Sequence, residues 1–223
     1  MKRICGIFLV VLALFSFGRE YSCQFAEGGW DMKDWRFVRS SRWPYEGKWL
    51  QKDGFIQNLA PEGASQDEML GKRAGETYTS MVLAEKLNGN AVITAETSFD
   101  YKMAPLIVIA GPLKENGDGA YPEYQEHWEI VLYFGGLNVW HHEIKDGKPY
   151  WRKAAYVQAK FQAGVKYELK AKIVFTAKVP MLEVSCGDCV MGCMLPSLPR
   201  EYYAGITACE GINKFYSFKA KSK

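Results

Sequence analysis

The stretch HWEIVLYFGGLNVWHHEIKDGKPYWRK, residues 127–153, decides the fold, because apolar residues alternate along it and two turn signals divide it. Alternation with a period of two is typical of β-strands. Gly135-Gly136 predicts a two-residue hairpin turn that places Phe134 opposite Leu137. Asp146-Gly147 predicts a second turn, so three antiparallel strands are expected to follow one another.

One face of this predicted meander is mainly apolar. Its side chains are Trp128, Ile130, Leu132, Phe134, Leu137 and Val139, followed toward the strand ends by His141 and Glu143. Successive side chains of a strand point to opposite faces, so these residues share one face and are expected to contact the core.

The opposite face combines aromatic, basic, acidic and amide side chains. The predicted register places Glu129, His142 and Trp151 in one row, beside a second row of Val131, Trp140 and Lys153. Aromatic rings stack on the C–H faces of sugars, and neighbouring polar groups read the hydroxyls. We therefore predict a carbohydrate-binding site made of Glu129, Tyr133, Asn138, Trp140, His142, Trp151 and Lys153. A solvated sheet face of mixed composition is the alternative, and so is coverage of this face by residues 19–48.

Short strand-like runs separated by turn signals fill the chain after residue 48, about a dozen in number, and no long amphipathic helix interrupts them. The best helix candidate is residues 66–72. This pattern predicts an all-β fold, an antiparallel sandwich or barrel. Residues 19–48 are rich in tryptophan and basic side chains, and we expect them to form an N-terminal extension that packs on the sandwich with an edge strand near Trp35.

The order of the predicted strands resembles the concanavalin A-like lectin/glucanase superfamily, and more narrowly the secreted bacterial laminin-G-like and keto-disaccharide-hydrolase-like jelly rolls. The resemblance rests on Gly47-Lys48-Trp49 with the Asp53-Gly54 hairpin, Glu96 to Phe99, Glu129 to Phe134, Tyr167 to Ile173, Leu182-Glu183-Val184, and Tyr203-Ala204-Gly205-Ile206 before Phe215-Tyr216-Ser217-Phe218. It implies a jelly-roll β-sandwich of two curved antiparallel sheets over residues 49–223. It also implies a lectin-like function, with an oligo- or polysaccharide as partner.

The first 18 residues read as a signal peptide. Lys2 and Arg3 precede an apolar run from Ile4 to Phe17, and Gly18 suits the cleavage position. We expect a protein that is secreted, periplasmic or held at the cell surface, without membrane insertion after signal removal. Loss of Lys2 and Arg3 from the 28 basic residues leaves 26 against 25 acidic ones, a balance that argues against nucleic acid as partner.

The cysteines of the mature chain allow more than one interpretation. Five remain after signal removal, Cys23, Cys186, Cys189, Cys193 and Cys209, and an exported protein commonly pairs some of them as disulfides. Cys186 and Cys189 flank a predicted Gly-Asp hairpin turn. A metal site at this spacing is the alternative, but no fourth ligand is visible.

Catalysis is the alternative to binding. Retaining glucanases of the superfamily carry a Glu-x-Asp-x-x-Glu strand, which this chain lacks, and Glu123, Glu126 and Glu129 alternate between strand faces. A glycoside hydrolase or polysaccharide lyase would have to use Glu129 with His142 as an acid/base couple. An adhesion module with a protein partner is a third interpretation.

The superfamily often carries structural calcium, and no other cofactor is expected. Asn116, Asp118 and Glu123 offer oxygen atoms in one predicted loop, although their spacing matches no known calcium loop.

Overall fold

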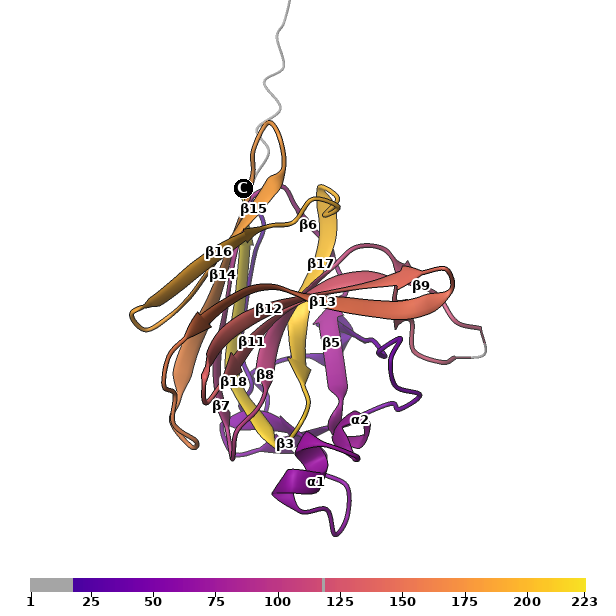
Figure 1. Cartoon of the computed structure of the whole chain (residues 1–223), viewed down its shortest axis with the longest axis vertical. Helices are drawn as coiled ribbons and strands as arrows, with labels where there is room; N and C mark the ends of the chain where they lie inside the picture. The colour runs from indigo at the N-terminus through magenta and orange to yellow at the C-terminus, as the bar shows by residue number, and fades with distance from the viewer. Residues whose placement is uncertain (1–17, 118) are drawn as a thin grey trace, which may run out of the picture.

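The computed structural model describes residues 18–117 and 119–223, and it consists mainly of two large antiparallel sheets (Figure 1). The predicted signal peptide lies outside the described residues except for Gly18. The described residues form 18 strands, more than the dozen predicted, because several edge strands have only two to five residues. Such short runs carry too little alternation to be recognised from sequence. The all-β jelly-roll sandwich is confirmed.

Sheet A has eight strands. Their order is β16 (Cys189–Met194), β15 (Pro180–Cys186), β14 (Tyr167–Phe175), β7 (Ala91–Phe99), β18 (Asn213–Ser222), β4 (Phe55–Asn58) and β3 (Trp49–Lys52), with β1 (Glu20–Gln24) paired to β18.

Sheet B also has eight strands. Their order is β13 (Lys148–Gln158), β12 (Gly136–Lys145), β11 (Glu126–Tyr133), β8 (Pro105–Ala110), β17 (Glu201–Ala208), β5 (Thr79–Leu83) and β2 (Trp35–Phe37), with β6 (Leu87–Asn88) paired to β17. A separate pair joins β9 (Leu113–Lys114) to β10 (Glu123–Tyr124).

The main core lies between the two sheets and follows the alternation of the strands. Trp128, Ile130 and Leu132 of β11 are at most 1% exposed and pack in one cluster with Ile93 and Ala95 of β7. Complete burial of a large apolar side chain contributes roughly 1.5–3 kcal/mol. The apolar face of the meander therefore belongs to the core, as predicted.

The segment before residue 49 supplies a strand to each sheet. β1 extends sheet A and β2 extends sheet B. Trp35 is buried, its ring centroid lies 5.1 Å from that of Phe218, and its indole N–H donates to Tyr21 Oη at 3.0 Å. Aromatic packing thus ties the N-terminal segment to both sheets.

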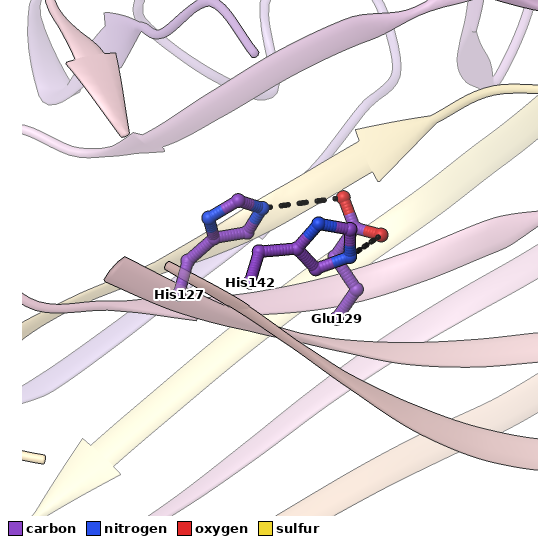
Figure 2. A group of neighbouring side chains, drawn as sticks. All are labelled: His127, Glu129 and His142. Carbon is purple, nitrogen blue, oxygen red and sulfur yellow. Dashed lines mark ion pairs between the residues drawn. The ribbon is translucent and has the colours of Figure 1, made fainter. Parts of the chain in front are cut away.

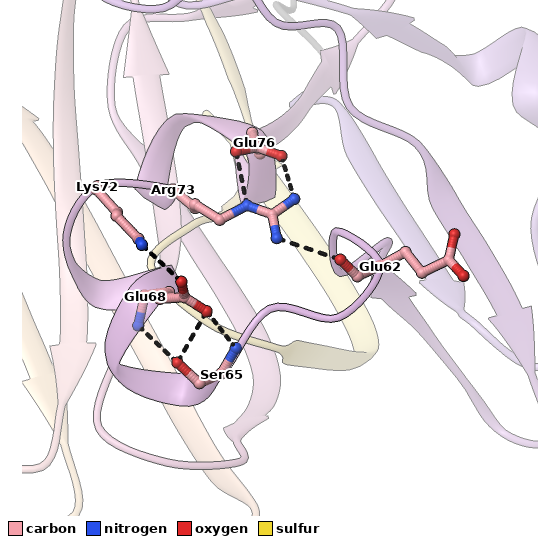
Figure 3. Close-up of polar contacts among 6 residues, drawn as sticks. All are labelled: Glu62, Ser65, Glu68, Lys72, Arg73 and Glu76. Carbon is pink, nitrogen blue, oxygen red and sulfur yellow. Dashed lines mark hydrogen bonds and ion pairs between the residues drawn. The ribbon is translucent and has the colours of Figure 1, made fainter.

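Two short helices, α1 (Gln66–Leu70) and α2 (Ala74–Thr77), lie at one end of the sandwich (Figures 1 and 3). A capping box begins α1, because Ser65 Oγ accepts from the Glu68 N–H and the Glu68 carboxylate accepts from the Ser65 N–H. The helix ends at Leu70, two residues before the predicted end, and Gly71 is its C-cap. A three-residue 3₁₀ turn, η1 (Met32–Asp34), precedes β2. The helices of the described part are all too short to cross a membrane.

The register of β11 and β12 differs from the prediction by two residues. The turn is Phe134-Gly135, so Tyr133 pairs with Gly136 and Leu132 with Leu137, and Phe134 is 49% exposed instead of buried in the core. Gly136 is the first residue of β12, where it pairs with Tyr133. Glycine suits this position because its φ is +146° and an added Cβ would overlap the Val157 carbonyl oxygen. Apart from Phe134, which lies in the turn, a shift of two residues leaves the side chains of both strands on their predicted faces.

The cysteines behave as separate thiols. Cys23, Cys186, Cys189, Cys193 and Cys209 are all free, so the expected disulfides are not present among the described residues. Cys186 and Cys189 do pair across the tip of the β15–β16 hairpin, as predicted. Burial raises the pKa of Cys186 to about 12 and that of Cys193 to about 11, so these thiols are protonated near neutral pH.

Candidate functional site

A pocket of about 350 Å³ opens on the face of sheet B that points away from sheet A. All seven residues predicted to bind carbohydrate line it. The remaining lining residues are Arg42, Trp43, Met103, Ala104, Leu106, Val131, Cys209 and Glu210. The structure therefore brings the predicted site residues together, and they line a recessed pocket on that face.

Alternation along three neighbouring strands supplies the floor of the pocket. Glu129 and Tyr133 come from β11, Asn138, Trp140 and His142 from β12, and Trp151 and Lys153 from β13. The pairings of His142 with Trp151 and of Trp140 with Lys153 are those predicted. Glu129 pairs with Trp140 and not with His142, which pairs with His127. The predicted row of Glu129, His142 and Trp151 is thus corrected, because the hairpin turn lies one residue earlier than expected.

Residues 19–48 cover this face only in part. Val38 is buried against the outer face of sheet B, and Trp43 packs beside it. Arg42 and Trp43 form one wall of the pocket, and Cys209 and Glu210, which follow β17, form another. The face is therefore walled by loops but remains accessible through the pocket.

The Glu129 carboxylate lies beside two histidines at the base of the site (Figure 2). Its Oε2 atom is 3.1 Å from His142 Nε2, and its Oε1 atom is 3.4 Å from His127 Nε2. All three residues are buried, with exposed fractions of 8% for Glu129, 4% for His142 and 1% for His127. Neither Nε2 atom forms a well-aligned hydrogen bond with the Glu129 carboxylate. His127 Nδ1 also lacks a hydrogen-bond partner among the described residues.

Ring stacking fixes the histidines in place. The ring centroids of His127 and His142 are 4.6 Å apart with an interplanar angle of 15°, and Tyr124 stacks on the other side of His127 at 4.4 Å. The Tyr124 hydroxyl is hydrogen-bonded to Ser80 Oγ at 2.8 Å, and Ser80 Oγ to Thr207 Oγ1 at 2.6 Å. The stack is thereby anchored to β5 and β17 in the middle of sheet B.

The surroundings separate the pKa values of the acidic and basic groups. Burial, only partly offset by Glu129, lowers the pKa of His127 to about 4, so this imidazole is neutral near neutral pH. Burial favours the protonated form of Glu129, but His142 and His127 outweigh it and lower the pKa of that carboxyl. Burial and then the charge of Glu129 raise the pKa of Glu210. In this pocket Glu129 is therefore ionised near neutral pH, and Glu210 accepts a proton more readily than an ordinary glutamate does.

Cations cover part of the aromatic surface. The Arg42 guanidinium lies 4.5 Å from the ring centroid of Trp43 and 4.3 Å from that of Trp151. Lys153 Nζ lies 5.3 Å from the ring centroid of Trp140. Cation–π contacts of this kind are worth about 0.5–2 kcal/mol each. A ligand that stacks on the face of Trp151 occupied by Arg42 must displace that side chain.

Sequence reasoning missed eight residues that line the pocket, and it also missed His127 at the base of the site. His127 was not included, although it lies two residues before Glu129 on the same strand and therefore shares its face. Arg42, Trp43 and Glu210 reach the pocket from loops, and strand alternation carries no signal for such residues.

A second polar cluster lies at the other face of the same strands. His141 stacks on Trp128 with ring centroids 4.8 Å apart, and its Nε2 atom is 2.8 Å from Glu126 Oε1. Ser197 Oγ donates to that same carboxylate oxygen. Glu143 lies at ion-pair distance from His141. This cluster gives the predicted core face a polar end.

Two groups among the described residues have the ligand types and spacing to hold a metal ion, His127 with Glu129 and His142, and Glu126 with His141 and Glu143. Neither group contains a cysteine, and neither contains the predicted calcium ligands. Asp118 lies outside the described residues, Glu123 forms an ion pair with Arg39, and the Asn116 side chain donates to Tyr121 O. The calcium site stays a prediction, with two of its three residues engaged by protein groups.

Solved structures similar to this one are proteins named for carbohydrates. The β-agarase A of Zobellia galactanivorans has a TM-score of 0.58 at 6% identity, over 92% of this chain and 93% of that chain. The winged bean acidic lectin complexed with methyl-α-D-galactose has a TM-score of 0.56 at 7% identity, over 92% and 98%. The carbohydrate-binding module CBM66 from Bacillus subtilis has a TM-score of 0.53 at 9% identity, over 82% and 92%. No protein-family model and no curated protein matches the sequence. At these identities the likeness shows the fold alone.

Proposed function

We propose that this chain, a concanavalin A-like jelly roll, is an exported protein that binds a glycan in the pocket on the outer face of sheet B. Its fold is similar to those of proteins named for binding or cleaving carbohydrates. Binding at this particular pocket rests on the side chains that line it.

One observation carries the proposal, namely that three tryptophans and several hydrogen-bonding side chains converge on one small pocket. Trp43, Trp140 and Trp151 line it together with Asn138 and Lys153. Its volume of about 350 Å³ is near the lower end of the roughly 300–1,000 Å³ of small-molecule sites. A pocket of this size suits one or two sugar residues at a chain end and not a long run of polysaccharide.

The lining residues would contact a sugar in two ways, by stacking and by hydrogen bonding. The indole rings of Trp140 and Trp151 offer apolar faces for the C–H groups of a pyranose. Asn138 Oδ1 is buried without a hydrogen-bond partner and is available to a sugar hydroxyl, and Lys153 donates at the edge. Burying an unpaired amide oxygen costs about 1–3 kcal/mol, which a ligand hydroxyl would recover on binding.

Affinity measurements with Trp151→Ala test the proposal, and Tyr150→Ala is the matched control. The two residues are neighbours on β13 and are equally exposed at 44%, but they point to opposite faces. A glycan array with the parent protein first identifies a ligand. We then expect Trp151→Ala to weaken binding about tenfold, equivalent to about 1.4 kcal/mol, and Tyr150→Ala to leave it unchanged. Equal affinities for the parent and Trp151→Ala would defeat the proposal.

Glycoside cleavage is the second candidate, because two carboxylates, Glu129 and Glu210, line the same pocket beside His142. Glycosidases need an acid and a base or nucleophile on either side of the scissile bond. Incubation with poly- and disaccharides, followed by assays for new reducing ends and for unsaturated uronates, distinguishes cleavage from binding. Products that disappear in Glu129→Gln would favour the enzyme.

A further inference from the structure

Three donor groups of metal-ligand type meet at the base of the pocket. His127 Nε2, His142 Nε2 and the two carboxylate oxygens of Glu129 supply nitrogen and oxygen donors, and one ligand atom from each residue falls within 4.8 Å of the others (Figure 2). The side chains come from two adjacent strands, β11 and β12, which hold their Cα atoms in a rigid antiparallel register.

The distances fit coordination of a common ion. A tetrahedral zinc ion with bonds of about 2.0–2.1 Å separates neighbouring donor atoms by roughly 3.3 Å. The distance from Glu129 Oε2 to His142 Nε2 is 3.1 Å, and that from Glu129 Oε1 to His127 Nε2 is 3.4 Å, so each imidazole nitrogen lies beside a different oxygen of the carboxylate. The imidazole rings stack with an interplanar angle of 15°, so binding one ion requires their Nε2 ends to tilt toward each other.

The two Nε2 atoms beside Glu129 are not satisfied by hydrogen bonds among the described residues, which leaves them available to a metal ion. Both Nε2 atoms lie at ion-pair distance from the carboxylate, yet both are buried without an aligned hydrogen bond. In an ion pair the N–H bond points at the oxygen, whereas in a coordination sphere the lone pairs of all donors point at a shared position. His127 is 99% buried, so water does not readily satisfy its Nε2 atom.

We propose that His127, Glu129 and His142 bind one divalent transition-metal ion, with zinc as the best fit to two imidazoles and one carboxylate. Two histidines and one glutamate are three protein ligands, and sites of that composition keep a further position for water or for a ligand. Glu129 and His142 line the pocket, so this position faces the bound molecule. The metal site does not depend on the proposed glycan.

Zinc titration of the mature chain, residues 19–223 without a polyhistidine tag, tests the proposal. The protein is stripped with EDTA, dialysed and titrated with zinc chloride by calorimetry, and bound metal is counted by elemental analysis. We expect one tightly bound ion per chain and a higher melting temperature with zinc. Removing a group that only hydrogen-bonds to a metal ligand lowers metal affinity by about 10–100-fold. We therefore expect Glu129→Gln and His142→Ala, which change a ligand itself, to lower the affinity for zinc by at least about 100-fold.

His141→Ala is the matched control, because His141 is the one histidine of the sequence outside the proposed site and its side chain points to the opposite face of the sheet. It should bind zinc as the parent does. Circular dichroism verifies that each variant folds, and the isosteric Glu129→Gln keeps the test valid if His142→Ala does not fold.

Three results would overturn the proposal. The first is a folded parent protein that binds no stoichiometric zinc. The second is binding that is equally tight in Glu129→Gln, which would point to the free thiols of Cys189 and Cys193. The third is loss of zinc in His141→Ala with retention in His142→Ala, which would move the site to the cluster of Glu126, His141 and Glu143. The titrations contain no sugar, so their failure leaves the glycan proposal standing.

Discussion

Replacing Gly136 with alanine tests the register of β11 and β12 on which the pocket depends. Gly136 has a φ of +146°, and an added Cβ would overlap the Val157 carbonyl oxygen and lie 3.1 Å from Ala159 N. These obstacles are backbone atoms at the end of β13 and in the residue that follows it, which cannot move without disturbing the pairing of β13 with β12. The neighbouring Gly135 is the control, since its added Cβ would meet only the Tyr133 ring, at 2.7 Å.

The expected cost combines two effects. A non-glycine residue in a sparsely populated backbone conformation costs about 1–3 kcal/mol, and overpacking costs about 1–3 kcal/mol more. Gly136→Ala should therefore lower the free energy of unfolding by about 2–6 kcal/mol, and Gly135→Ala by about 1 kcal/mol or less, since a ring at the surface can turn aside.

Urea denaturation gives the free energy of unfolding of both variants and thermal unfolding gives their melting temperatures, each followed by tryptophan fluorescence. At about 2–4 °C per kcal/mol, the melting temperature of Gly136→Ala should fall by at least about 4 °C. If both glycines lay in the turn, as the sequence alone suggested, the two variants would be similarly affected. Losses of stability within about 1 kcal/mol of each other would refute the register argument.

Three further stability predictions follow from buried contacts, each measured by urea denaturation. Leu132→Ala should lower the free energy of unfolding by about 2–5 kcal/mol, because Leu132 is fully buried. Phe134→Ser, in the exposed turn, should change it by less than about 0.5 kcal/mol. Equal effects of the two substitutions would contradict the observed turn. Asn58→Ala should cost about 2–4 kcal/mol, because its side chain bonds Thr77 O, Gly211 O and the Asn213 N–H in the interior, and a neutral result would show that these bonds contribute nothing. Ser65→Ala removes the cap of α1 and should cost about 1 kcal/mol, with Ser41→Ala as an uncapped comparison.

The sequence predicted the fold well because strand alternation and turn residues are local signals. The Asp146-Gly147 turn and the faces of Trp128, Ile130 and Leu132 follow directly from a period of two. The order of the strands resembles the concanavalin A-like superfamily, and the similar solved structures confirm the jelly-roll fold that this resemblance implied.

The site was only partly predictable. The floor residues of the pocket follow from alternation, so all seven expected residues line it. The walls come from loops around Arg42 and Glu210, whose approach depends on contacts distant in sequence. The hairpin register was wrong by two residues because a Gly-Gly pair does not reveal which glycine the neighbouring strand requires.

The alternation of core and pocket residues along β11 and β12 has a consequence for how this protein tolerates insertions and deletions. His127, Glu129 and Val131 share their strand, one residue apart, with Trp128, Ile130 and Leu132. Gain or loss of a single residue within either strand would exchange the two faces, burying charges in the core and turning the core side chains into the pocket. The loops that form the walls carry no such restriction. Length changes should therefore reshape the entrance of the pocket freely, while its floor changes only by substitution.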